Sequence, residues 1–267
     1  MTGDRFRWVG GGEYESFVGR WSRLVAQMFV RWLELEAGAR VVDVGCGTGA
    51  LTTALLELAD PEAVVGVDPS AGFIGHAREQ TTDPRATFAV AGAESLPFED
   101  GAFDVAVSGL VLNFVPDAAR GVAESARVVR RGGCVAAYVW DYAGRMELLR
   151  HFWDAAVRLD PTAGALDEGR RFPICEPVAL AELFAGAGLL QAETREIVVP
   201  TVFSDFDDYW QPFLSGEAPA PGYAMSLTEE RRGALRERIR ERLPTASDGS
   251  IALVARAWAI RGTKEGP

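Results

Sequence analysis

The sequence predicts an α/β fold in which helices cover both faces of a mostly parallel sheet, a doubly wound arrangement. Short, continuously apolar runs alternate with segments of helical periodicity as far as Trp140, a pattern typical of parallel strands buried on both faces. A glycine-rich turn joins the first of these runs to a helix, where a ligand binds in such sheets. Strands are expected at 40–44, 63–67, 87–90, 103–108 and 134–140, and helices at 14–36, 51–58, 71–79 and 118–129, with Gly132-Gly133 ending the last helix.

The second half of the sequence departs from this alternation and is rich in aromatic residues. We predict helices at 146–159, 177–186 and 227–243, strands at 194–200 and 250–260, loops at 161–168 and 216–223, and a helical or irregular segment at 203–214. Residues 1–267 are expected to form a single domain. Its core would comprise about 14–142, 176–200 and 248–262, with helical lid insertions at about 143–175 and 201–247 that cover the carboxyl edge of the sheet.

The net charge and the cysteine content of the chain limit the kinds of binding partner that we expect. The chain has 267 residues and a formal net charge of -11, so it gains little from neutralising nucleic-acid phosphates, and no nucleic-acid partner is expected. The arginines between 231 and 242 alternate with glutamates and are interpreted as a solvated helix face. Three widely spaced cysteines indicate neither disulfides nor a metal site.

Targeting and membrane signals are also missing from the sequence. No signal peptide and no membrane span are recognised, so we expect a cytoplasmic protein. Richness in Ala, Arg, Val and Gly is typical of a GC-rich bacterial genome. The oligomeric state stays open, a homodimer included.

The glycine turn at residues 43–49, DVGCGTG, fits two cofactors. Gly45, Gly47 and Ala50 satisfy a dinucleotide fingerprint, and Asp68 lies where a ribose-binding acid is expected. Asp43, however, places a carboxylate beside the turn, which favours the sulfonium and ammonium groups of S-adenosylmethionine over an anionic pyrophosphate.

Four motifs in order resemble the class I methyltransferases of the group that includes the ubiquinone- and menaquinone-biosynthesis (type 11) enzymes. They are VVDVGCGTGALT, VVGVDPSAGFIGHAR, AGAESLPFEDGAFDVAVSGLVLNFVPD and RRGG, within residues 14–140. The resemblance implies a Rossmann-like sheet of seven strands in the order 3-2-1-4-5-7-6, with the last strand antiparallel. It also implies transfer of a methyl group from S-adenosylmethionine.

The resemblance assigns cofactor roles residue by residue. Asp68 would accept from the ribose hydroxyls, and Phe73 would lie under the adenine or in the core. Gly92 stands where the family commonly has an acid for the adenine amino group, so this contact would pass to Glu94, backbone or water. Arg20 is either a partner of the methionine carboxylate or an ordinary surface arginine. The full set of expected cofactor residues is Tyr14, Arg20, Asp43, Gly45, Cys46, Gly47, Thr48, Gly49, Asp68, Pro69, Ser70, Phe73, Ala93, Glu94, Ser108, Gly109 and Leu110.

The sequence is less informative about the acceptor. Methyl transfer from a sulfonium needs a general base only if the acceptor keeps its proton. Asp141 is the first candidate, although capping the next helix is the competing role, and His151 is the second. Aromatic residues beyond position 139 favour a small or medium, fairly apolar acceptor with a carbon or oxygen nucleophile. A non-catalytic S-adenosylmethionine-binding protein and an NAD-dependent oxidoreductase are the alternatives. Cys46 is interpreted as a small side chain that fills the turn.

Overall fold

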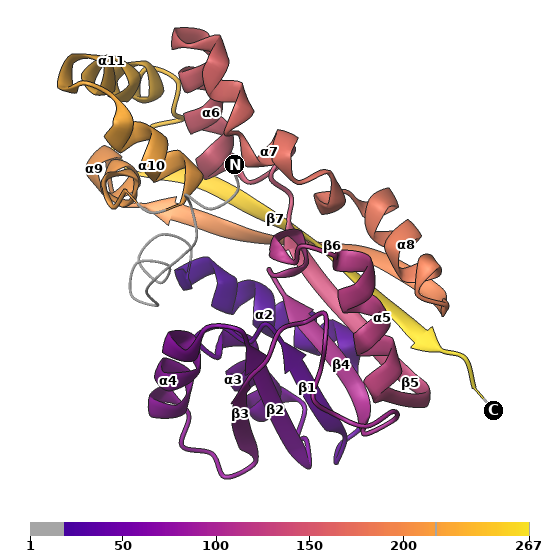
Figure 1. Ribbon diagram of the computed structural model, residues 1–267. Coiled ribbons are helices and arrows are strands. Elements are labelled where there is room, and N and C mark those ends of the chain that lie inside the picture. Colours follow the sequence, from indigo (N-terminus) through magenta and orange to yellow (C-terminus); the bar gives the residue numbers. More distant parts are fainter. Residues whose placement is uncertain (1–18, 217, 267) are drawn as a thin grey trace. The chain divides into compact units, whose positions relative to one another are not determined.

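A computed structural model describes residues 19–216 and 218–266 of the chain. It contains a seven-stranded sheet in the order β3-β2-β1-β4-β5-β7-β6 (Figure 1). The strands β1 to β5 pair in parallel, and β7 pairs antiparallel with β5. The strands are β1 (Arg40–Val44), β2 (Ala63–Asp68), β3 (Ala86–Val90), β4 (Phe103–Gly109), β5 (Val129–Trp140), β6 (Leu189–Phe203) and β7 (Ile251–Lys264). The expected doubly wound sheet, its strand order and its antiparallel last strand are confirmed.

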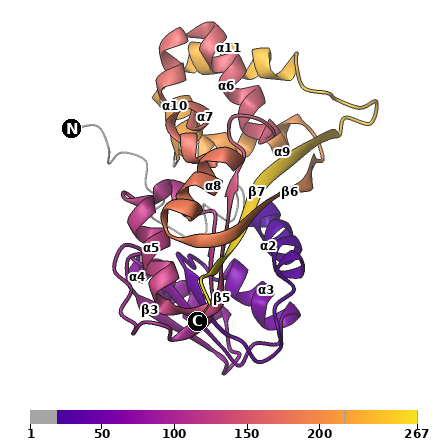
Figure 2. The same cartoon turned by 90° about the vertical axis from the view of Figure 1, so that its right-hand side faces the viewer.

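Helices cover both faces of the parallel part of the sheet. Figure 2 shows α2 (Arg20–Leu33) and α3 (Ala50–Leu58) on one face, and α5 (Ala118–Val128) and α8 (Pro177–Gly186) on the other. The remaining helix of this part is α4 (Ala71–Gln80), and a short 3-10 helix, η2 (Leu112–Phe114), follows β4. The two central strands are almost entirely buried between these layers, which explains their continuous apolar runs.

The chain divides into two compact units. The larger, which we call the sheet unit, comprises 22–140, 174–197 and 257–266 of the described residues. The smaller, the helical unit, comprises 19–21, 141–173 and 198–256. Its elements are α6 (Glu147–Leu159), η3 (Pro161–Ala165), α7 (Glu168–Arg171), α9 (Phe206–Trp210), η5 (Gln211–Leu214), α10 (Pro219–Ser226) and α11 (Glu229–Arg240), with η4 (Pro173–Cys175) at its border. That 143–175 and 201–247 act as a lid stays a prediction.

Aromatic side chains form the core of the helical unit. Phe152, Trp153, Tyr209 and Phe213 are fully buried. The rings of Phe152 and Phe213 stack at 4.6 Å between centroids, and the Tyr209 hydroxyl donates to the carbonyl of Leu148 at 2.8 Å. These residues hold the unit together because buried aromatic side chains contribute large apolar areas.

Three expectations about local structure are wrong. Residues 216–223 were expected to be a loop because of their prolines, but Pro219 stands in the first turn of α10, where its missing N–H costs nothing. Residues 161–168 contain η3 for the same reason, with Pro161 at its start. Gly132-Gly133 does not end a helix: α5 ends at Val128, and both glycines lie within β5.

Candidate functional site

The glycine turn after β1 has a backbone that only glycine adopts easily. Gly45, Gly47 and Gly49 have φ of +77°, +52° and +93°, in the left-handed region that penalises a Cβ atom. A Cβ atom on Gly45 would also overlap the side chain of Val111. The amides of Gly45 and Cys46 both donate to the carbonyl of Val67, at 2.7 and 3.0 Å, so the turn is fixed to the end of β2.

Asp68 organises the same turn from the end of β2. One carboxylate oxygen accepts from the amide of Gly47 at 3.1 Å and the other from the amide of Ser70 at 2.8 Å. Burial raises the pKa of Asp68, and these two N–H donors partly oppose that rise. Each oxygen keeps a second lone-pair direction, so the carboxylate is able to accept two further hydroxyl donors, as the ribose assignment requires.

Asp43 is a fully buried carboxyl beneath the turn. Its Oδ2 accepts from the Thr52 hydroxyl on α3 at 2.7 Å, while its Oδ1 is buried without a hydrogen-bond partner among the described residues. Burial raises the pKa of Asp43 to about 7, because the charged form loses its hydration. A cation bound nearby would supply the missing electrostatic partner.

Further unpartnered polar atoms lie at the end of β4, next to β1 in the sheet. Asp43 is paired in register with Val107, and the hydroxyl of the following Ser108 is buried without a partner in the described part of the chain. The oxygen and the nitrogen of the Asn113 side-chain amide, in η2, are also buried without a partner among the described residues. Buried polar groups normally have partners, so these atoms fit a polar ligand at the carboxyl ends of β1 and β4.

The backbone between Ser108 and Asn113 is strained. Leu110 adopts φ of +62° without being glycine, a conformation that costs roughly 1–2 kcal/mol. Its amide donates to the carbonyl of Tyr138 at 2.7 Å. Gly109 is required because a Cβ atom there would overlap the Tyr138 ring. Such outliers persist where the surroundings hold them and are frequent at functional sites.

Cys46 is a packing residue in this turn. Its side chain is buried in a cluster with Ile74, Ala77 and Phe88, and burial raises the pKa of its thiol above the usual range. The other two cysteines are shielded as well. Cys175 is buried, and burial raises the pKa of the half-buried Cys134 to about 11. None of the three thiols is therefore activated as a nucleophile.

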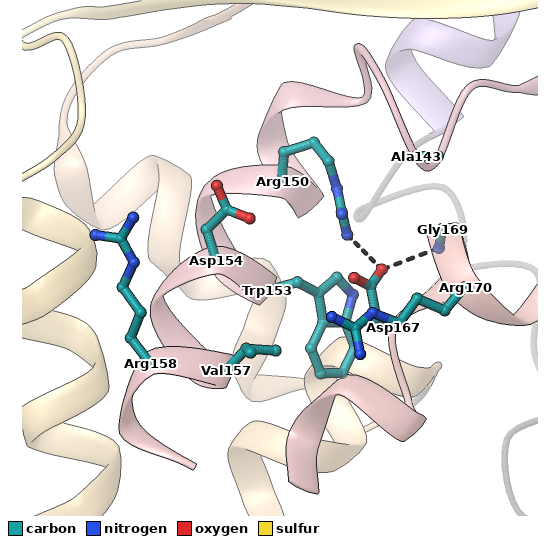
Figure 3. Close-up of a pocket in the computed structure, with 9 residues that line it drawn as sticks. All are labelled: Ala143, Arg150, Trp153, Asp154, Val157, Arg158, Asp167, Gly169 and Arg170. Carbon is teal, nitrogen blue, oxygen red and sulfur yellow. Dashed lines mark hydrogen bonds and ion pairs between the residues drawn. The ribbon is translucent and has the colours of Figure 1, made fainter. Parts of the chain in front are cut away.

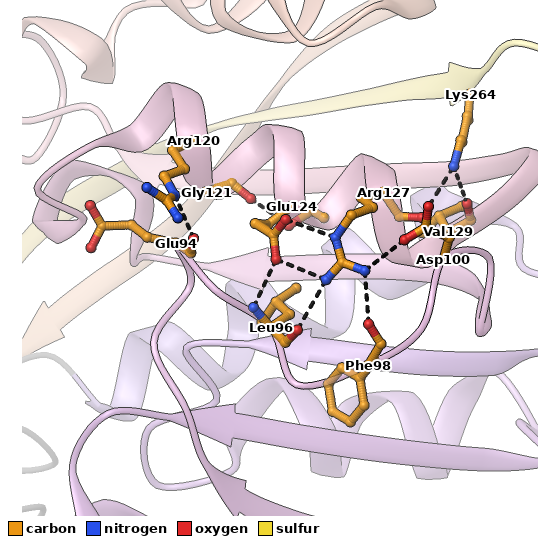
Figure 4. A network of polar contacts seen from close by, with 11 residues as sticks. Glu94, Leu96, Phe98, Asp100, Arg120, Gly121, Glu124, Arg127, Val129 and Lys264 are labelled. Atoms are coloured by element: carbon orange, nitrogen blue, oxygen red, sulfur yellow. Dashed lines mark hydrogen bonds and ion pairs between the residues drawn. The ribbon is translucent and has the colours of Figure 1, made fainter.

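The loop that carries Ala93 and Glu94 is held by α5 through a polar network (Figure 4). The Glu94 carboxylate accepts from the amide of Asp117 at 3.0 Å, at the start of α5. Arg127 donates to the carbonyls of Leu96 and Phe98 and pairs with Glu124. Glu94 thus has a structural partner, and its proposed adenine contact stays a prediction.

The other expected cofactor residues of the sheet unit differ in exposure. Ser70 caps α4 by accepting from the amide of Phe73 at 3.3 Å, and Phe73 is half-buried. Pro69 is exposed, whereas Thr48 and Ala93 are half-buried. Tyr14 lies outside the described residues. Arg20 belongs to the helical unit, where it pairs with Asp208 at 3.4 Å.

The two candidate bases also lie in the helical unit. The Asp141 carboxylate accepts from the amides of Gly144 and Arg145, at 2.9 and 2.8 Å, and pairs with Arg256 at 2.7 Å. This arrangement is that of a buried anchor for the turn before α6. The competing role of capping the next helix is wrong, because the N-cap of α6 is Met146 and no side chain caps it. His151 is half-buried on α6, and desolvation lowers its pKa, so its imidazole is mainly neutral at pH 7.

Sequence reasoning missed Thr52, Asn113 and Val111 as parts of the site. Thr52 lies nine residues after Asp43, on the buried face of α3. The available signal was a hydroxyl side chain among the apolar residues of the buried face of α3. Among the described residues, no group of His, Cys, Asp and Glu side chains is arranged to hold a metal ion, and no helix has the length and apolarity to cross a membrane.

Comparison with known proteins finds similar methyltransferases. Residues 42–137 match the family model of a methyltransferase domain. The 2-methyl-6-phytyl-1,4-hydroquinone methyltransferase of Synechocystis sp. is 31% identical over 183 residues, 67% of this chain and 56% of the relative. The malonyl-[acyl-carrier protein] O-methyltransferase of Geobacter sulfurreducens is 30% identical over 179 residues, 66% of each chain.

Similar folds occur among solved structures. The YcgJ protein from Bacillus subtilis aligns with a TM-score of 0.59 at 17% identity, covering 91% of this chain and 99% of its own. This likeness concerns the fold. The chain spans 27%, 56% and 45% of the lengths of the first three curated relatives.

The sheet order, the glycine turn and the methyltransferase-domain match over residues 42–137 together agree with a class I methyltransferase domain of the S-adenosylmethionine-dependent type. Within that class, the match over residues 42–137 shows that the chain resembles the type 11 group, as the sequence motifs indicated.

Proposed function

We propose that the protein transfers a methyl group from S-adenosylmethionine to a carbon or oxygen atom of a small or medium, fairly apolar acceptor. The observation that carries this proposal is the buried Asp43 carboxyl, one oxygen of which lacks a partner in the described part of the chain. S-adenosylmethionine, when bound, supplies an activated methyl group on a positively charged sulfur. A carboxylate at this place favours such a cation and would repel a pyrophosphate.

The residues of the turn have separate tasks in this proposal. Asp68 would orient the ribose through its two oxygens, and the glycines would let the backbone approach the ligand closely. The polar atoms of Ser108 and Asn113 would bind the polar end of the cofactor or the acceptor. Catalysis then consists of aligning the acceptor atom with the methyl carbon and excluding water, since the leaving group is already activated.

The acceptor class is proposed from two sources. One relative is named as a ubiquinone/menaquinone biosynthesis C-methyltransferase and another as a malonyl-[acyl-carrier protein] O-methyltransferase, so both carbon and oxygen nucleophiles stay open. Asp141 and His151 are the side chains to test as a base if the acceptor keeps its proton. The net charge of -11 disfavours a nucleic-acid partner, and the few cysteines suit a cytoplasmic enzyme. The richness in Ala, Arg, Val and Gly supports a bacterial origin.

Titration calorimetry with S-adenosylmethionine, S-adenosylhomocysteine and NAD tests the cofactor. We expect both sulfur ligands to bind and NAD not to bind; NAD binding without either sulfur ligand would overturn the proposal. Turnover is tested by incubating the protein with methyl-labelled cofactor and a bacterial extract fractionated by size. A labelled small molecule supports methyl transfer, whereas binding of the cofactor with no labelled product across extracts indicates a non-catalytic binding protein.

A further inference from the structure

The helical unit contains a cavity of about 310 Å³ that is lined by side chains of α6, η3–α7 and the turn before α6. Figure 3 shows the arginines Arg150, Arg158 and Arg170 around it, together with Trp153. All its lining residues belong to this one unit, so the cavity does not depend on the glycine turn. A volume of this size accommodates a small molecule.

Arg150 has an ion-pair partner, but one of its N–H donors has no hydrogen-bond partner among the described residues. Its guanidinium pairs with Asp167, whose carboxylate also accepts from the amide of Gly169 at the start of α7. The Nε atom of Arg150 is buried and has no hydrogen-bond partner in the described part of the chain. A buried donor without a partner is costly, and Arg150 nonetheless keeps this position at the wall of the cavity.

Arg158 and Arg170 have no carboxylate partner among residues 19–216 and 218–266. The guanidinium of Arg170 lies against Gly164 in η3, where a Cβ atom would overlap it. The absence of a side chain at Gly164 therefore allows Arg170 to take this position.

The acidic groups at the cavity leave an excess of positive charge. Asp154 lies on the exposed turn of α6 between Arg150 and Arg158, and Asp167 is engaged by Arg150 (Figure 3). Two carboxylates thus face three guanidiniums. The indole N–H of Trp153 donates to the carboxylate of Glu168. Both side chains are buried, so they support the wall of the cavity without exposing a surface to a ligand.

We propose that this pocket, defined by Arg150, Arg158 and Arg170, binds a small molecule through a carboxylate or phosphate group. Guanidinium groups bind both anions with paired, charge-assisted hydrogen bonds. The pocket supplies donors from three arginines, and the half-buried Val157 lines it with apolar surface. The inference concerns the helical unit and stands whether or not the sheet unit transfers methyl groups.

The test is calorimetry at low ionic strength with benzoate, phenyl phosphate and the uncharged benzyl alcohol. We expect saturable binding of at least one of the two anions and no binding of the alcohol. The anion that binds more tightly shows whether the pocket prefers a carboxylate or a phosphate. Arg170→Gln and Arg158→Gln should each weaken the better anion about tenfold, the loss expected for a hydrogen bond between charged groups. The matched control, Arg238→Gln, removes the same charge from an exposed position on α11 and should have no such effect.

Gly164→Ala provides a variant that changes no charge. It should displace the Arg170 guanidinium and weaken the anion by a smaller factor than Arg170→Gln. Urea unfolding of each variant shows that the fold is kept, since Arg158 and Arg170 are both exposed. The proposal is overturned if neither anion saturates, or if the Arg170, Arg158 and Arg238 variants bind the anions as the unchanged protein does. Calorimetry with S-adenosylhomocysteine on the same samples reports on the sheet unit separately.

Discussion

The sheet unit and the helical unit each contain a group of unsatisfied polar atoms, but only the first can be recognised in the sequence. In the sheet unit, the site depends on backbone conformations that glycine alone adopts easily, at Gly45, Gly47 and Gly49. In the helical unit, the pocket depends on side chains of α6 and α7, whose helical backbone accepts many residues. A site that needs special backbone conformations therefore produces a recognisable sequence motif. A site built from side chains on ordinary helices produces no such motif.

Both units also contain a deeply buried carboxyl with a similar pKa. Burial raises the pKa of Asp43 in the sheet unit and of Glu168 in the helical unit to about 7 each. They differ in their partners. Glu168 accepts from the Trp153 indole, whereas one oxygen of Asp43 has no partner among the described residues. We infer that Glu168 has a structural role in the helical unit, and that the unpartnered oxygen of Asp43 belongs to a ligand-binding site.

The largest expected effect is on the pH dependence of stability. Both carboxyls hold their protons more tightly in the folded protein than in the unfolded chain, so stability falls as the pH rises from about 4 to about 7. Between pH 5 and pH 8 the two together should lower the free energy of unfolding by roughly 5 kcal/mol, at about 1.4 kcal/mol per pKa unit for each group. Urea unfolding at several pH values measures this.

Variants separate the two contributions. Asp43→Asn and Glu168→Gln should each remove about half of the pH dependence, and the exposed control Asp248→Asn should remove none. Bound S-adenosylmethionine should favour the charged form of Asp43 and so reduce the contribution of Asp43 to the pH dependence. The contribution of Glu168 should stay the same. An unchanged profile in Asp43→Asn would contradict the assignment of a raised pKa to this group.

The second effect concerns the glycine turn. Gly45→Ala should lower the free energy of unfolding by about 3 kcal/mol, because the added Cβ atom meets Val111 and φ is positive. Its control is Gly75→Ala in α4, where a Cβ atom meets nothing within 4 Å. That substitution should stabilise the protein by up to about 1 kcal/mol. Equal effects of the two, measured by urea unfolding, would mean that the turn is not conformationally constrained.

A third effect concerns binding. Asp68→Ala should weaken S-adenosylmethionine and S-adenosylhomocysteine about a hundredfold, since it removes a charged acceptor of two hydrogen bonds and frees the amide of Gly47. The control Asp205→Ala removes a carboxylate that caps α9 in the helical unit and should leave both affinities unchanged. Calorimetry gives both values; retained affinity in Asp68→Ala would eliminate the ribose assignment.

The smallest effect tests the aromatic core of the helical unit. Tyr209→Phe should cost about 1 kcal/mol of unfolding free energy, because the hydroxyl donates to the carbonyl of Leu148 within the core. Urea unfolding measures the loss, which should be independent of S-adenosylhomocysteine. Phe206→Leu, a neighbouring change with no hydrogen bond to lose, serves as the comparison. A loss of cofactor affinity in Tyr209→Phe would show that the two units are energetically coupled.

The sequence predicts the sheet unit well because its strands are buried on both faces and its turn needs glycine. It predicts the helical unit less well. Pro219 and Pro161 suggest loops, yet each opens a helix, since proline fits a first turn as readily as a loop. The orphaned amide of Asn113 and the pairing of Arg150 with Asp167 depend on tertiary packing between separate segments, which no local pattern reports.

The burial of Cys46 in the turn has a practical consequence for labelling. Thiol reagents attack the thiolate, whereas burial raises the pKa of Cys46 and Cys134, and Cys175 is buried. A single cysteine introduced at an exposed position such as Met225, whose side chain is 43% exposed, would be the preferred target of a maleimide dye at neutral pH. A fluorophore can thus be attached to the helical unit while the native cysteines, including the one in the cofactor turn, stay in place.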